Sequence, residues 1–117
     1  MILEHFYDAR RTGKKKLAVL IDPDKPDQEQ LLELIREISI AEADMIFLGG
    51  SLLVRDNVDE FIDIIKEHSE IPVILFPGSI SQLNGKADAL LFLSLISGRN
   101  PDLLIGKHVI TAPFLKM

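Results

Sequence analysis

Cysteine is absent from the 117 residues of this chain. Its absence excludes disulfide bonds, thiolate metal sites and thiol catalysis. It is also compatible with a reducing compartment, and we expect the protein in the cytoplasm. A chain of this length can bury a modest core without cross-links, so we expect one structural unit over residues 1–117.

An excess of positive charge and long apolar runs are lacking as well. The net charge is −5, whereas nucleic-acid-binding proteins usually carry a basic face that neutralises phosphates. No apolar run reaches the roughly 20 residues that span a bilayer, and charged residues occupy the N-terminal region where a signal peptide would be apolar. We therefore expect neither a nucleic-acid partner nor a transmembrane segment.

Short apolar runs alternate with helical patterns along the chain. The runs lack polar alternation, as in strands buried on both faces of a parallel sheet, and they cover residues 17–21, 45–48, 73–76 and 89–93. Asp27 and Gln30 predict a capping box for the helix after the first run, and Asp56 or Asn57 is the expected N-cap of the next helix. Pro101 fits the first turn of a helix after the fourth run.

The order of these elements is four consecutive strand-helix units. Such an order predicts parallel strands joined by right-handed crossovers. We therefore expect an α/β fold that forms half of a (β/α)8 TIM barrel. An open flavodoxin-like or Rossmann-like sheet has the same alternation and is the alternative.

Polar residues follow the strands rather than precede them. Asp22, Ser51 and Ser79 come after the first, second and third runs, and residues 97–100 come after the fourth. In parallel α/β folds the carboxyl ends of the strands carry the active site. The candidate substrate contacts at this rim are Gly49, Gly50, Gly78, Ser79 and Arg99.

Two short motifs at this rim have a chemical interpretation. The Gly-Gly pair before Ser51 can present backbone N–H groups to a phosphate because glycine permits close approach, and the alternative is a tight strand-to-helix turn. Asp22 can bind Mg²⁺, an ion that prefers oxygen ligands, or can shape the turn before the next helix. Arg99 can pair with a phosphate or occupy the surface.

Four segments together resemble successive blocks of a known family. They are LIDPDK at residues 20–25, FLGGS at 47–51, PVILFPGS at 72–79 and ADALLFLSLISGRNPD at 87–102. In this order they are similar to the geranylgeranylglyceryl phosphate synthase family, which includes heptaprenylglyceryl phosphate synthases. The resemblance extends over nearly the whole chain.

The resemblance implies a TIM barrel and a prenyltransferase. In that family a polyprenyl group of geranylgeranyl type passes from its diphosphate to sn-glycerol 1-phosphate, which makes an ether bond for phospholipid biosynthesis. The cofactor is Mg²⁺. The family's metal ligands fall on Asp22 and Ser51 of this chain.

The chain departs from the family pattern in two respects. Leu20 occupies a position where some branches of the family have a lysine. A TIM barrel usually takes about 250 residues, and the family's glycerol phosphate site is built mainly from later loops.

Half a barrel has open edge strands, which predict a homo-oligomer. We expect this chain to be inactive by itself. The alternative function is that of a catalytically incompetent fragment or a self-assembling α/β scaffold.

Overall fold

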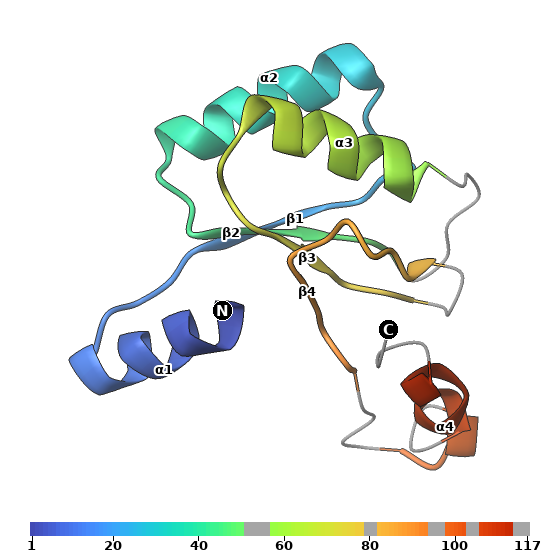
Figure 1. Ribbon diagram of the computed structural model, residues 1–117. Coiled ribbons are helices and arrows are strands. Elements are labelled where there is room, and N and C mark those ends of the chain that lie inside the picture. Colours follow the sequence, from blue (N-terminus) through green and yellow to red (C-terminus); the bar gives the residue numbers. More distant parts are fainter. Residues whose placement is uncertain (51–56, 79–81, 94–97, 103–105, 114–117) are drawn as a thin grey trace.

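The computed structural model describes residues 1–50, 57–78, 82–93, 98–102 and 106–113 (Figure 1). The helices are α1 (Ile2–Thr12), α2 (Gln28–Ile40), α3 (Val58–His68) and α4 (Lys107–Thr111), and the strands are β1 (Ala18–Ile21), β2 (Met45–Leu48), β3 (Val73–Leu75) and β4 (Ala89–Leu90). No helix in these ranges is long and apolar enough to cross a membrane.

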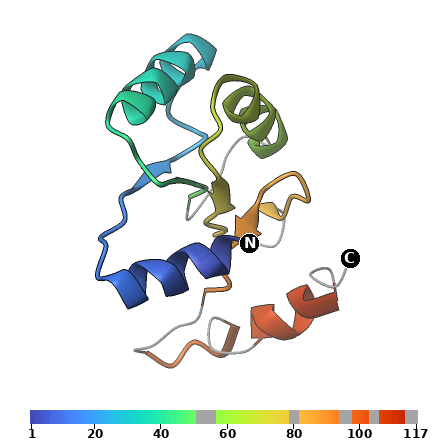
Figure 2. The same cartoon turned by 60° about the vertical axis from the view of Figure 1, so that its left-hand side comes forward.

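The strands form one parallel sheet in the order β1-β2-β3-β4. This order follows the chain without the reversal that defines a doubly wound sheet. Both crossover helices, α2 and α3, lie on the same face of the sheet, whereas α1 and α4 lie on the other side (Figures 1 and 2). The half-barrel prediction is therefore confirmed, and the open-sheet alternative is wrong.

The core lies between the sheet and helices α2 and α3. Matched residues of neighbouring strands point to this layer, as with Ile21, Leu48 and Leu75, which are at most 2% exposed. The apolar stripe of α3 packs against them, and Ile62 and Ile65 are fully buried. Apolar burial of this kind is the main source of stability in a small domain.

Helix starts agree with the sequence predictions to different degrees. The Asp27 carboxylate accepts the Gln30 N–H at 2.8 Å, and the Asp27 N–H donates to Gln30 Oε1 at 3.0 Å, which confirms the capping box. Asn57 is the N-cap of α3, as predicted, but its side chain makes no capping bond. It donates instead to the Pro23 carbonyl at 2.8 Å, so it ties α3 to the turn after β1.

The structure differs from the sequence predictions in three respects. β1 is not buried on both faces, because it is an edge strand whose Leu20 is 54% exposed on the face away from α2 and α3. β4 ends at Leu90 rather than near Leu93, and Leu93 is exposed. Helix α1 was not predicted, since it buries little beyond Ala9.

Two aspartates join strands at the amino end of the sheet. Asp44 accepts the Leu17 N–H at 2.9 Å and pairs with Lys16 at 2.7 Å. Asp88 repeats the arrangement, accepting the Val73 N–H at 2.8 Å and pairing with Lys66 at 2.8 Å. Each carboxylate therefore connects the start of one strand to the start of the strand beside it.

Candidate functional site

Asp22 begins the turn that follows β1. Its Oδ1 accepts the Asp24 N–H at 3.1 Å, which is a local turn contact, and its Oδ2 lies 3.8 Å from Lys25 Nζ. The Asp22 side chain is 31% exposed, whereas that of Lys25 is 81% exposed. The aspartate thus shapes the turn, and its side chain remains partly exposed at the rim, so metal binding by Asp22 stays a prediction.

Gly49 ends β2 in a conformation that requires glycine. Its φ is +148°, and a Cβ built there would lie 2.0 Å from the Phe76 carbonyl oxygen. The Gly49 N–H donates to the Ile21 carbonyl at 3.1 Å. The glycine therefore lets the backbone after β2 lie close to the backbone after β3. A tight turn alone would not require this close contact.

An open hollow of about 790 Å³ joins these two features. Asp22, Gly49, Gly50 and Phe76 line it together with part of α2. The structure therefore brings three of the predicted site residues, Asp22, Gly49 and Gly50, to one place. The shared rim that the sequence predicted is confirmed for these three.

The remaining predicted residues have different outcomes. Gly78 lies beside this group, linked to Gly50 through one side chain. Arg99 is exposed, and the lining of the hollow, within the part of the chain that is described, does not include it. Ser51 and Ser79 lie outside the described residues, so the pairing of Asp22 with Ser51 stays a prediction.

Gln82 is a rim residue that no sequence pattern identifies. It is 4% exposed, its Oε1 accepts the Gly78 N–H at 3.1 Å, and its Nε2 donates to the Gly50 carbonyl at 3.1 Å. A single glutamine in an irregular segment carries no local signal. Its role depends on two turns that are distant in sequence.

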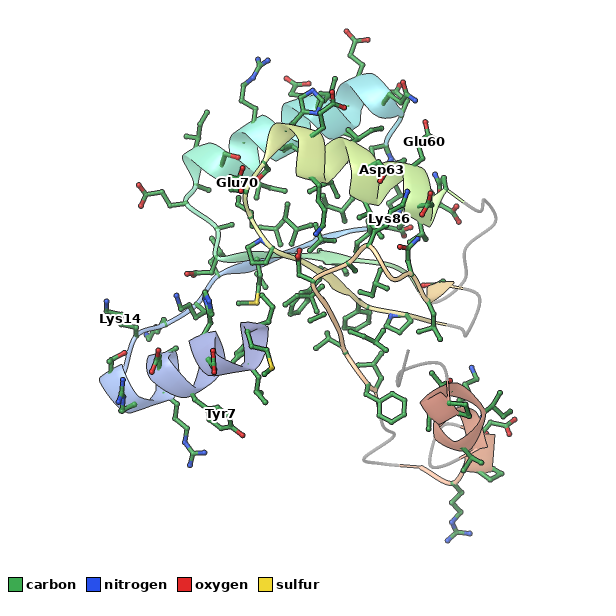
Figure 3. All side chains as sticks on the ribbon, viewed as in Figure 1. Tyr7, Lys14, Glu60, Asp63, Glu70 and Lys86 are labelled. Carbon is green, nitrogen blue, oxygen red and sulfur yellow. The ribbon has the colours of Figure 1, made fainter. Side chains whose placement is uncertain are left out.

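A charged cluster holds the segment of Gln82 against α3. Lys86 Nζ lies 2.6 Å from Asp63 (Figure 3). It also lies 2.8 Å from Asp59, and the Asn84 amide donates to Asp59 at 2.7 Å. The hydrogen bond from Lys86 is the main cause that lowers the pKa of Asp59, and the bond to Asp59 raises the pKa of Lys86. Both shifts favour the charged forms of Asp59 and Lys86.

Any metal at this rim would have few protein ligands. No group of three or more His, Cys, Asp or Glu residues is placed to hold a metal ion anywhere in the described ranges. Mg²⁺ commonly uses one or two carboxylates and completes its shell with water and substrate phosphates. The partly exposed carboxylate of Asp22 beside two glycines fits such a site, and Glu33 and Glu37 of α2 line the same hollow.

The face of the sheet away from α2 and α3 is apolar next to the hollow. The rings of Phe47 and Phe76 stack with centroids 6.3 Å apart and an interplanar angle of 29°. Leu20, which is paired in register with Phe47, also lines the hollow. The arrangement offers a polar rim with an apolar surface immediately beside it.

Comparison with known proteins places this geometry in one family. A model of the PcrB family matches residues 10–116. The geranylgeranylglyceryl phosphate synthase of Chitinophaga pinensis is 50% identical over 115 residues, which make up 98% of this chain and 46% of that protein. The enzyme of the same name from Flavobacterium johnsoniae is 45% identical over 98% of this chain and 47% of its own length.

Solved structures agree with the sequence relatives. The crystal structure of (S)-3-O-geranylgeranylglyceryl phosphate synthase from Thermoplasma acidophilum, in complex with its substrate sn-glycerol 1-phosphate, is 32% identical. It superposes with a TM-score of 0.80 over 92% of this chain and 44% of that one. The chain therefore spans about half the length of the relatives that it matches.

Proposed function

The chain belongs to the PcrB family, and on that premise we propose that it supplies the N-terminal half of a prenyltransferase. The reaction would transfer a polyprenyl group of geranylgeranyl type from its diphosphate to sn-glycerol 1-phosphate, in the cytoplasm, for ether phospholipid biosynthesis. The observation that carries the proposal is the shared rim of Asp22, Gly49 and Gly50 in a fold that superposes on such a synthase.

The polar rim suits the diphosphate end of the donor. Asp22, with Ser51 as the second expected ligand, would hold Mg²⁺. When bound, the ion would neutralise the diphosphate leaving group. Gly49 and Gly50 have no side chains to block a phosphate, and their backbone is held by the contacts to Ile21 and Gln82.

The apolar surface beside the rim suits the prenyl end of the donor. Phe47, Phe76 and Leu20 lie at this position, and Leu20 is 54% exposed. Covering these groups with an isoprenoid chain would remove apolar area from water. The order of polar rim and apolar face thus matches a molecule with a charged head and a long hydrocarbon tail.

We also propose that residues beyond this chain supply the rest of the barrel and most of the glycerol phosphate site. This chain covers 46% of its Chitinophaga relative, and its edge strand β1 exposes Leu20. By itself we expect the chain to be inactive and to assemble into a homo-oligomer, since open edges and an apolar face favour association. The second candidate function, a self-assembling α/β scaffold, rests on that same exposed face.

A radiolabelled transfer assay tests the proposed activity. The assay contains Mg²⁺, sn-glycerol 1-phosphate and prenyl diphosphates of several lengths, and it compares this chain with a form extended to the length of the relatives. We expect product from the extended form, and a rate at least about 100-fold lower with Asp22→Ala, because Mg²⁺ loses a protein ligand and no longer neutralises the diphosphate. Asp8→Ala, on the exposed face of α1, is the matched control and should leave the rate unchanged.

The outcomes separate the parts of the proposal. No product from the extended form would refute the prenyltransferase function. Product that persists in Asp22→Ala would refute the metal assignment alone. Product from the 117-residue chain would refute its inactivity, and a monomer in light scattering would refute the oligomer.

A further inference from the structure

Among the described residues, the direct backbone hydrogen bonds between β2 and β3 end at the carboxyl rim. The Phe76 N–H donates directly to the Leu48 carbonyl at 2.8 Å. In a parallel pair, the next bond of the same kind lies two residues further along each strand. It would join the Gly78 N–H to the Gly50 carbonyl.

The side-chain amide of Gln82 occupies the place of that missing bond. Its carbonyl accepts the Gly78 N–H and its amide group donates to the Gly50 carbonyl, each at 3.1 Å. The glutamine therefore acts as an inserted peptide group. The two turns are held apart by the width of one amide, yet they remain connected.

Burial makes this arrangement specific. Gln82 is only 4% exposed, and a buried amide is costly unless its donor and acceptor are both used. Both are used here, each on the backbone of a different turn. A residue that merely filled this space would more often be apolar.

The position of Gln82 is fixed from both sides. Its Oε1 lies 3.4 Å from where a Cβ on Gly49 would be, so the amide packs against the glycine turn. On the other side, the bonds of Asn84 and Lys86 to Asp59 attach the same segment to α3. The amide thus has little freedom to move.

We infer that Gln82 is a positioning residue for the rim, because it sets the separation between the Gly49-Gly50 turn and the Gly78 turn. The inference rests on the proposed function, in which the Gly49-Gly50 turn receives the diphosphate of the donor. Backbone groups bind an anion well only when they are preorganised at the right spacing. Gln82 contacts no substrate in this scheme and acts through the two turns.

Two substitutions separate the contacts of the amide from its volume. Gln82→Glu retains an acceptor for the Gly78 N–H but presents a carboxylate to the Gly50 carbonyl. Gln82→Met retains the length and removes both polar contacts. Glu67→Gln, the reverse change on an exposed residue of α3, is the control.

The experiment measures binding, stability and local structure in the same four proteins. Calorimetry with inorganic pyrophosphate and Mg²⁺ should show affinity lowered about tenfold or more in both Gln82 variants, the amount expected for one or two lost hydrogen bonds. The midpoint temperature of thermal unfolding should change little in Gln82→Met, so a loss of stability would not explain its loss of pyrophosphate affinity. Pyrophosphate affinity equal to wild type in both Gln82 variants would overturn the inference.

If the wild-type chain binds no pyrophosphate, that result counts only against the proposed function of this chain. NMR then still tests the inference about Gln82. The Gln82 side-chain amide should exchange slowly with solvent, and the Gly50 and Gly78 amide signals should shift in Gln82→Met but not in Glu67→Gln. Unshifted glycine signals in Gln82→Met, or a rapidly exchanging side-chain amide, would show that Gln82 does not hold the turns.

Discussion

The aspartates at the two ends of the sheet make different contacts. At the amino end, Asp44 and Asp88 each accept an N–H of a neighbouring strand and pair with a lysine at less than 3 Å. At the carboxyl end, Asp22 bonds within its own turn and lies 3.8 Å from Lys25. The amino end therefore uses its carboxylates to join strands, whereas Asp22 stays partly exposed at the carboxyl end, the end at which TIM barrels bind their ligands.

At the carboxyl end, the backbone at Gly49 lies very close to the backbone at Phe76. Gly49→Ala tests how much stability depends on this close approach. The new methyl group would meet the Phe76 carbonyl at 2.0 Å in a backbone with φ of +148°. We expect a loss of about 3 kcal/mol or more in the free energy of unfolding, measured with urea.

Gly85→Ala is the control for that substitution. A Cβ at Gly85 meets nothing within 4 Å, so the free energy of unfolding should change by less than about 1 kcal/mol. Equal losses in the two variants would mean that the close approach of β2 and β3 does not limit stability.

A smaller effect distinguishes the carboxylates of the two ends. Asp88→Ala leaves the Val73 N–H and Lys66 without their partner, and we expect a loss of about 1 kcal/mol in the free energy of unfolding. Asp22→Ala removes only a turn contact and should cost less than about 0.5 kcal/mol.

Asp88→Asn sharpens this comparison, because the amide oxygen can still accept the Val73 N–H. Chemical denaturation of the three variants should rank Asp88→Ala as the least stable. A larger loss for Asp22→Ala would reverse the assignment of roles to the two ends.

The pH dependence of stability is the smallest effect. The hydrogen bond from Lys16, followed by that from the Leu17 N–H, lowers the pKa of Asp44 from its usual value of 3.8. A group whose pKa is lower in the folded state stabilises it above the unfolded pKa, and this contribution disappears as pH falls through the folded value.

Wild type and Asp44→Asn should therefore differ most above about pH 4 and converge in more acidic solution, as followed by thermal unfolding. Addition of 1 M salt should reduce the difference, because Asp44 and Lys16 are partly exposed. A difference that grows on acidification would contradict the pairing.

Local patterns were sufficient for much of the fold. The capping box of Asp27 and Gln30 was predictable because its partners are three residues apart. The apolar stripe that includes Ile62 and Ile65 was predictable because helical periodicity is local. The gathering of Asp22 with Gly49 and Gly50 followed from the general rule that parallel strands share a carboxyl end.

Other features required partners that no local pattern identifies. Gln82 is separated by 32 residues from Gly50, and Asp44 by 27 residues from Leu17. The exposure of Leu20 was predicted wrongly because its apolar run indicates a strand but does not say whether a second layer covers it.

The amino-acid order by itself therefore determined the sequence of strands and helices, the rim that carries the candidate site, and the glycines that make room there. These depend on periodicity and on backbone conformations of single residues. The tertiary structure alone decided that a glutamine replaces a hydrogen bond between two strands, that aspartates join strands at the opposite end, and that one sheet face stays partly open. Each of these is a contact between distant segments, and such contacts are settled by packing in three dimensions.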